Sequence, residues 1–124
     1  MRLLLDTHAA LWWLDDAAPL GERALTLLAD ERSEVLLSAV VVWEVAIKRA
    51  LGKLEAPDGF ASTLLGAGAR ALPIALEHAA AVERLPAIHA DPFDRLLVAQ
   101  AQREGATILT KDAVLARYGV DVAW

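Results

Sequence analysis

The N-terminal segment Leu3-Leu4-Leu5-Asp6 places the strongest constraint on how this chain folds. Three leucines without polar alternation predict a short strand buried on both faces, as at the centre of a parallel sheet covered by helices. The run ends on the Asp6 carboxylate, and a helical pattern begins at Ala9. Because function in such sheets collects at the carboxyl ends of the strands, Asp6 is the first candidate site residue.

The composition is that of a globular protein. Of 124 residues, 56% are hydrophobic and 23% charged, and we expect one domain over residues 1–124. No apolar run approaches the ~18 residues of a membrane span, and Asp6 interrupts the N-terminal run too early for a signal peptide. We therefore expect a cytoplasmic protein with no membrane partner.

Cysteine content and net charge limit the possible chemistry. The chain has no cysteine, which excludes disulfides, thiolate nucleophiles and thiolate metal sites. A net charge of −5 argues against holding nucleic acid through a general basic field. A nuclease remains compatible with this charge, because bound divalent cations reverse the local sign where carboxylates cluster.

Strand-like and helical segments alternate along the chain. Strands are predicted over 3–5, 35–37, 71–74, 107–110 and 120–124, and helices over 9–14, 22–29, 40–51, 60–65, 76–85, 92–104 and 112–118. This alternation predicts an α/β fold, a three-layer α/β/α sandwich with a central, mainly parallel sheet. Pro73 favours a sheet-edge position for its strand.

The predicted helix over 9–14 carries four large apolar residues, Leu11-Trp12-Trp13-Leu14, around nearly its whole circumference. One core layer cannot bury all four. Part of this helix is therefore a candidate interface with a partner.

Four carboxylates fall near one edge of the predicted sheet. They follow the first strand, lie in the helix after the second strand, lie in the 92–104 helix and follow the 107–110 strand: Asp6, Glu44, Asp94 and Asp112. Each also has an ordinary structural explanation. Asp6 and Asp112 suit helix N-caps, and Glu44 can pair with Lys48 one turn later. Asp91-Pro92-Phe93-Asp94 reads as a helix start, with Asp91 as the cap.

Glu44 distinguishes a functional cluster from four unrelated acids. It lies between Trp43 and Val45 in a predominantly apolar helix, and a buried acid needs a partner. Several carboxylates without a cysteine or histidine cluster suit a hard cation, Mg²⁺ or Mn²⁺, which can activate water for attack on a phosphodiester. Without metal, crowded carboxylates should raise at least one pKa.

The segments LLLDTHAALWWL, SAVVVWEVAIK, HADPFDRLLVAQA and TILTKD resemble, in order, the successive motifs of PIN-domain proteins, and among them toxins of the VapC type. The resemblance runs from Leu3 to the last predicted strand. It implies a PIN-like fold and a Mg²⁺-dependent or Mn²⁺-dependent endoribonuclease acting on RNA. It also implies a cognate antitoxin, which wraps the toxin and inserts a side chain near the acids, and a homodimer.

The resemblance also implies roles for individual residues. Asp6 and Asp94 match direct metal ligands, Asp112 a direct or water-mediated ligand, and Glu44 a ligand or a residue that positions the attacking water. Thr110 matches a hydroxyl position beside the last acid. Asp91 belongs to the motif too, although helix capping explains it equally well.

The basic and aromatic residues in and near these motifs are open to two interpretations. Lys48, Arg95 and Lys111 could meet RNA phosphates or be ordinary surface residues. His8 lies near Asp6, but the spacing of His8, His78 and His89 indicates no zinc site. The four tryptophans favour core or interface over base stacking, because none lies in a basic stretch.

Two other functions compete with the nuclease. In an acid-nucleophile α/β phosphatase Asp6 would attack the substrate, but a haloacid-dehalogenase-like enzyme would have a second Asp at the position of His8. A PIN-like binding module that has lost catalysis would lack one of the acids, and all four are present.

Overall fold

Strand β1 (Arg2–Leu5) lies at the centre of the sheet in the computed structural model, which describes residues 1–124. It pairs in parallel with β2 (Glu34–Ser38) on one side and β4 (Thr107–Leu109) on the other. Strands β3 (Arg70–Leu72) and β5 (Val122–Ala123) form the edges, which gives the order β3-β2-β1-β4-β5. The leucines of β1 are fully buried, as their uninterrupted run predicts.

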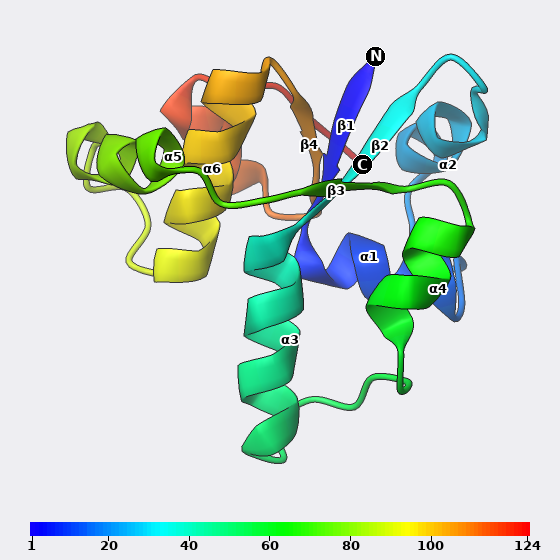
Figure 1. The fold of residues 1–124 in the computed structure, drawn as a ribbon. Helices are drawn as coiled ribbons and strands as arrows, with labels where there is room; N and C mark the ends of the chain where they lie inside the picture. Colours follow the sequence, from blue (N-terminus) through cyan, green and yellow to red (C-terminus); the bar gives the residue numbers. More distant parts are fainter.

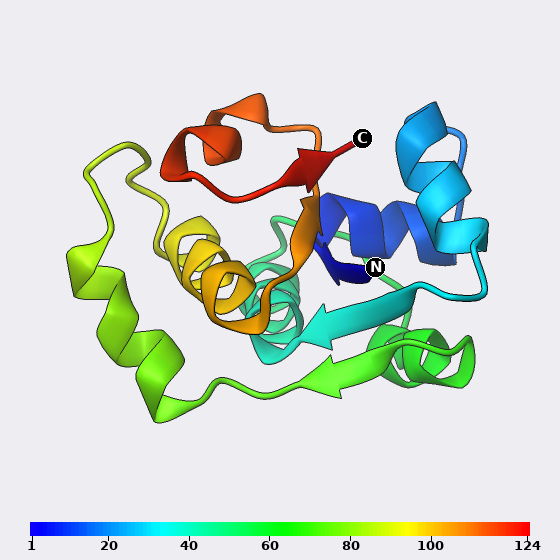
Figure 2. The same ribbon diagram turned by 90° about the horizontal axis from the view of Figure 1, so that it is seen from above.

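Helices cover both faces of this all-parallel sheet (Figures 1 and 2). They are α1 (Thr7–Leu14), α2 (Glu22–Ala29), α3 (Ala39–Ala50), α4 (Phe60–Gly66), α5 (Leu76–Ala81) and α6 (Pro92–Glu104), with 3₁₀ turns η1 (Val82–Arg84) and η2 (Ala113–Tyr118). In Figure 2, α5 and α6 lie together on one side of the sheet and α1 and α2 on the other. The predicted α/β fold is confirmed, and the edge position predicted for the third strand is correct.

The differences from the predicted elements lie at their ends. The helix predicted over 76–85 becomes a 3₁₀ turn at Val82, and the one predicted over 112–118 is 3₁₀ throughout. The last strand pairs only over Val122–Ala123. Short segments such as these are held by packing rather than by their own propensity.

None of the four large apolar residues of helix α1 is fully buried, as predicted for a helix that one core layer cannot cover. Leu11, Trp12, Trp13 and Leu14 are all partly buried and pack against the core. The exposed large apolar residues lie elsewhere, with Trp43 on α3 51% exposed and Leu65 on α4 42% exposed. No helix combines the length and the apolar character that crossing a membrane requires.

Two strand-to-helix junctions at the carboxyl end of the sheet position the site. Asp6 ends β1 and caps α1, and Ser38 ends β2 and caps α3 by accepting from the Val40 N–H at 3.0 Å. Because no loop separates β2 from α3, the helix projects beyond the sheet edge (Figure 1). The first turns of both helices therefore lie beside the strand ends, where Glu44 is within reach of Asp6.

Helix α6 is anchored through a buried amide. The side chain of Gln100 is fully buried, accepts a hydrogen bond from the Ser38 hydroxyl and donates to the Pro73 carbonyl at 3.2 Å. These contacts tie α6 to the ends of β2 and β3. They fix the N-terminal turn of α6, which carries Asp94, against the same sheet edge.

Candidate functional site

A cavity of about 450 Å³ opens at the carboxyl edge of the sheet. Eleven residues line it, and Trp12 is the only hydrophobic one. All five residues expected to form the site from the sequence lie on its wall: Asp6, Glu44, Asp94, Thr110 and Asp112. Four separate elements, distant in sequence, therefore bring their carboxylates to one cavity.

Asp6 has both a capping role and an exposed edge on the cavity. Its Oδ1 accepts from the Ala9 N–H at 2.8 Å, as the capping interpretation predicts. Burial raises the pKa of Asp6 above its usual value, opposed by a hydrogen bond with Thr110. Thr110 is itself buried, and its Oγ1 accepts from the Asp112 N–H at 3.0 Å. The hydroxyl therefore lies between two acids of the site.

Glu44 is buried, with 8% of its surface exposed, and it has two partners. The Thr7 hydroxyl donates to Oε1 at 2.6 Å, and the Lys48 ammonium forms an ion pair with Oε2. The pair holds the pKa of Lys48 above its usual value. Both interpretations of Glu44 thus hold at once, since it pairs with Lys48 as a surface acid would and also lines the cavity.

Among the acids of the site, Asp94 has the most strongly shifted pKa. Burial raises its pKa from 3.8 to about 6, and the neighbouring carboxylate of Asp91 adds to the rise. The expected rise is present, but loss of solvation contributes more than repulsion between carboxylates. Asp91 caps α6, since its Oδ1 accepts from the Phe93 and Asp94 N–H groups at 2.8 and 3.3 Å.

His89 joins the acids, which the spacing of the histidines in the sequence did not indicate. Its Nε2 lies 3.3 Å from Asp94 Oδ2 and 3.4 Å from Asp112 Oδ2. Its Nδ1 accepts from the Asp91 N–H at 3.1 Å, which assigns the ring proton to Nε2. Ligand atoms of His89, Asp94 and Asp112 all lie within 4.8 Å of one another. The motif HADPFD contains the only sequence signal for this contact.

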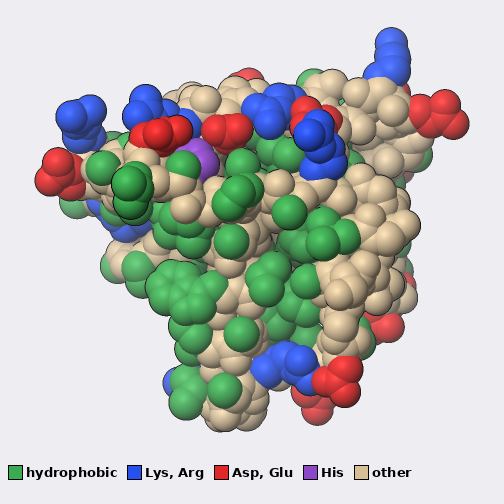
Figure 3. Space-filling model, viewed as in Figure 1, with side chains coloured by type: hydrophobic (Ala, Val, Ile, Leu, Met, Phe, Trp, Pro, Cys, Tyr) green, Lys and Arg blue, Asp and Glu red, His purple; other side chains and the backbone are tan.

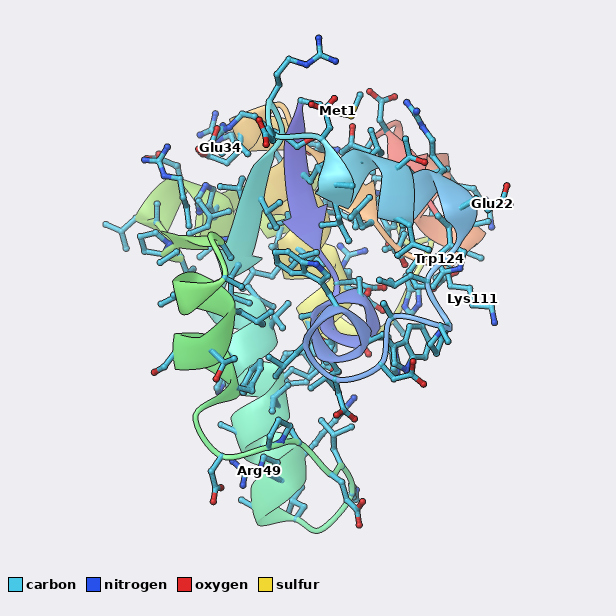
Figure 4. The ribbon with its side chains drawn as sticks, turned by 90° about the vertical axis from the view of Figure 1, so that its right-hand side faces the viewer. Met1, Glu22, Glu34, Arg49, Lys111 and Trp124 are labelled. Carbon is cyan, nitrogen blue, oxygen red and sulfur yellow. The ribbon has the colours of Figure 1, made fainter.

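The three basic residues named from the sequence have different environments. Lys48 is paired with Glu44. Arg95 turns inward and donates to the carbonyls of Pro86, Val82 and Leu85 at 2.8, 3.2 and 3.3 Å, which holds the segment before α6. Lys111 is exposed on the cavity rim and in no ion pair, and its side chain points into solvent in Figure 4. Only Lys111 is free to meet a phosphate.

Comparisons with known proteins assign the chain to a family and relate its fold to solved structures. A family model described as PIN domain matches residues 3–121. No curated protein matches the chain significantly.

Similar solved structures include complexes from three bacteria. VapBC2 from Rickettsia felis, bound to a DNA fragment from its promoter, has a TM-score of 0.72 and 16% identity, covering 99% of this chain and 98% of that chain. DNA-bound VapBC from Salmonella typhimurium has a TM-score of 0.70 and 16% identity, covering 99% of this chain and 97% of that chain. FitAcB from Neisseria gonorrhoeae has a TM-score of 0.64 and 20% identity, covering 97% of this chain and 95% of that chain. At these identities the likeness is one of fold.

Proposed function

The chain belongs to the PIN-domain family, and from that premise we propose that it is a divalent-metal-dependent endoribonuclease, the toxin of a toxin–antitoxin pair. One observation carries the proposal: carboxylates from four separate elements line a single cavity with one hydrophobic wall residue. A set of acids used only for capping would have no reason to converge on one cavity.

The donor set fits a hard cation. Its donors are carboxylate and hydroxyl oxygens, and the pKa values of Asp6 and Asp94 are raised chiefly by burial, so a bound cation would favour the charged forms of both side chains. Two imidazoles lie near the acids: His8 lines the cavity, and the Nε2 of His89 faces Asp94 as a hydrogen-bond donor in the tautomer that the Asp91 N–H contact indicates. This chemistry favours Mg²⁺ or Mn²⁺ over zinc.

In the proposed mechanism, Asp6, Asp94 and Asp112 would hold the cation. When bound, Mg²⁺ or Mn²⁺ supplies Lewis-acid chemistry to water and to a phosphodiester of RNA. Glu44, fixed by Thr7 and Lys48, orients the attacking water or completes the ligand set. The Thr110 hydroxyl orients Asp6, and Lys111 draws in the phosphate.

The partners proposed are a cognate antitoxin and a second copy of the chain. The similar solved structures are VapBC and FitAB complexes, and this chain presents a surface suited to a partner. A second cavity of about 430 Å³ is lined by ten residues, nine of them hydrophobic. Contributing residues come from α3, α4 and the end of β3, among them Val42, Trp43, Leu65 and Leu72; we call this cavity the apolar groove.

The test is cleavage of defined structured RNAs by the purified protein with Mg²⁺, with Mn²⁺ and with chelator. The comparison pairs Asp6→Asn with Asp121→Asn, an exposed acid outside the cavity. Metal-dependent cleavage that only Asp6→Asn lacks supports the nuclease.

The same experiment separates the competing functions. An absence of cleavage together with no stabilisation by metal would favour a binding module that has lost catalysis. Release of phosphate from monoesters with RNA left intact would favour an acid-nucleophile phosphatase instead.

A further inference from the structure

Two aromatic rings form one wall of the acid-lined cavity. His8 and Trp12 both line it, and their ring centroids lie 5.3 Å apart with the planes tilted by 32°. They are four residues apart on α1, the spacing that places side chains one above the other on a helix face. The helical geometry of α1, which Asp6 caps, therefore places the two rings side by side on the cavity wall.

The inner ring of this wall is held in place by the C-terminus. Trp124 packs edge-on against Trp12 with centroids 5.6 Å apart. The Trp124 carbonyl accepts from the Arg23 N–H at 3.2 Å, and its main chain packs against Gly21 so closely that a Cβ there would lie 2.3 Å from the Trp124 carbonyl carbon. Trp12 is thus fixed before any ligand arrives.

No polar contact within the chain holds the His8 ring, the outer of the two. His8 is exposed, and its imidazole makes no hydrogen bond or ion pair within the chain. It is backed by Trp12 and opens onto the cavity that holds the acids. An exposed ring packed at a tilt against a second ring leaves an aromatic face toward the cavity, and aromatic faces are what single-stranded nucleic-acid binders offer to a base.

A free cation lies on the same cavity. Lys111 lines it and is unpaired, and Figure 4 shows Lys111 and Trp124 on the same side of the molecule. The aromatic face of His8 suits the base of a nucleotide, and the unpaired ammonium of Lys111 suits its phosphate. Trp12 lies in no basic stretch of the sequence, but in the fold Lys111 lines the same cavity.

We propose that His8, backed by Trp12, stacks a base of the nucleotide flanking the scissile phosphate, while Lys111 contacts the backbone of the same strand. The proposal rests on the proposed nuclease function and assigns its substrate a single-stranded, unpaired base at the cleavage point. Stacking accepts every base, so this wall contributes affinity for unpaired RNA without choosing its sequence.

The test compares His8→Ala and His8→Phe in steady-state cleavage of an RNA loop, with and without an abasic nucleotide beside the cut. On the intact loop, His8→Ala raises KM about 10-fold with kcat within about twofold, and His8→Phe restores KM. On the abasic loop, wild type and His8→Ala have the same KM. Mn²⁺ affinity, measured by titration, is unchanged in both variants.

Several outcomes would overturn the proposal. An unchanged KM in His8→Ala, or an equal rise on the abasic loop, removes the stacking role. A fall in kcat with weakened Mn²⁺ binding places His8 in the metal site instead. If the wild-type protein cleaves nothing, the proposed nuclease function is refuted, and the stacking role is tested by binding instead. Fluorescence anisotropy then measures affinity for a labelled single-stranded oligoribonucleotide. Weaker binding by His8→Ala than by wild type supports the stacking role, and equal binding refutes it.

Discussion

The acid-lined cavity and the apolar groove have nearly the same volume and opposite chemistry. The first has one hydrophobic residue among eleven, and the second has nine among ten. Helix α3 contributes to both, with Glu44 and Lys48 on the cavity and Val42, Trp43 and Ala46 on the groove. Figure 3 shows hydrophobic side chains gathered over α3 and α4. One helix thus separates a cavity lined by charged and polar residues from a groove lined by apolar ones.

Phe93 connects the two regions. Its ring packs against Trp43 with centroids 5.0 Å apart, and Lys48 Nζ lies 6.0 Å from its centroid. Phe93 is also the residue before Asp94. Phe93 therefore lies between Trp43, which lines the groove, and the turn of α6 that carries Asp94.

The largest expected effect is the loss of RNA cleavage when an acid of the acid-lined cavity is replaced. Asp6→Asn removes a charge that no other residue replaces, so we expect RNA cleavage to fall about 1000-fold, corresponding to about 4 kcal/mol of transition-state stabilisation. Self-association, which uses other surfaces, should not change. The rates and the sedimentation of Asp6→Asn and Asp121→Asn are measured together. Full activity in Asp6→Asn would contradict the proposed site.

The next effect concerns the apolar groove alone. Leu65→Asp places a charge among apolar residues, so we expect homodimer affinity to fall about 100-fold, or about 2.7 kcal/mol. Sedimentation equilibrium measures the change. Leu51→Asp is the control, since Leu51 is 62% exposed and outside the groove. A dimer that survives Leu65→Asp would leave the groove to the antitoxin.

A third variant tests the wall of the acid-lined cavity through its support. Gly21 has an ordinary negative φ, so Gly21→Ala adds no backbone strain, and its Cβ would displace both the main chain and the side chain of Trp124. We expect the free energy of unfolding to fall by about 2 kcal/mol in urea titrations. Gly66→Ala, where a Cβ meets no atom within 4 Å, should change it by less than about 1 kcal/mol. Equal losses in the two variants would refute the close packing.

The smallest effect is the pH dependence of metal-free stability. Because the pKa of Asp94 is raised from 3.8 to about 6, its favourable contribution is fully present below about pH 4 and is lost as pH rises through about 6. Asp94→Asn should remove this loss and stabilise the metal-free protein at pH 7 by about 1 to 2 kcal/mol, since the side chain is 28% exposed and solvent screens part of the cost.

Urea unfolding in chelator near pH 4 and pH 7 measures this difference. Asp121→Asn, which lies outside the cavity, should keep the wild-type slope between the two pH values. Identical slopes in Asp94→Asn and wild type would mean that Asp94 ionises freely.

Elements with strong local signals could be predicted closely. The 92–104 helix has the predicted bounds because Asp91 caps it, Pro92 suits its first position and Gly105 ends it with a φ of 61°. The segment around Val82 lacks such signals. Its helix turns into 3₁₀ where carbonyls accept from Arg95, a partner thirteen residues away that no local pattern reveals.

The candidate site divides in the same way. Asp6 and Asp112 could be placed from the strand ends, and the Glu44–Lys48 pair from helix spacing. The Thr7–Glu44 hydrogen bond joins residues 37 apart. His89 meets Asp112 across 23 residues, and the packing of α6 against β4 brings them together.

The sequence by itself determined where the acids stand on their own elements, because capping, strand burial and helix period act over a few residues. Only the tertiary structure decided which side chains share a cavity and which apolar face stays exposed. The core covers α1 only in part and leaves Trp43 on α3 and Leu65 on α4 exposed, so the structure adds a second candidate partner surface at Trp43. Such choices depend on contacts between distant segments, and those form only when the sheet and its helices pack together.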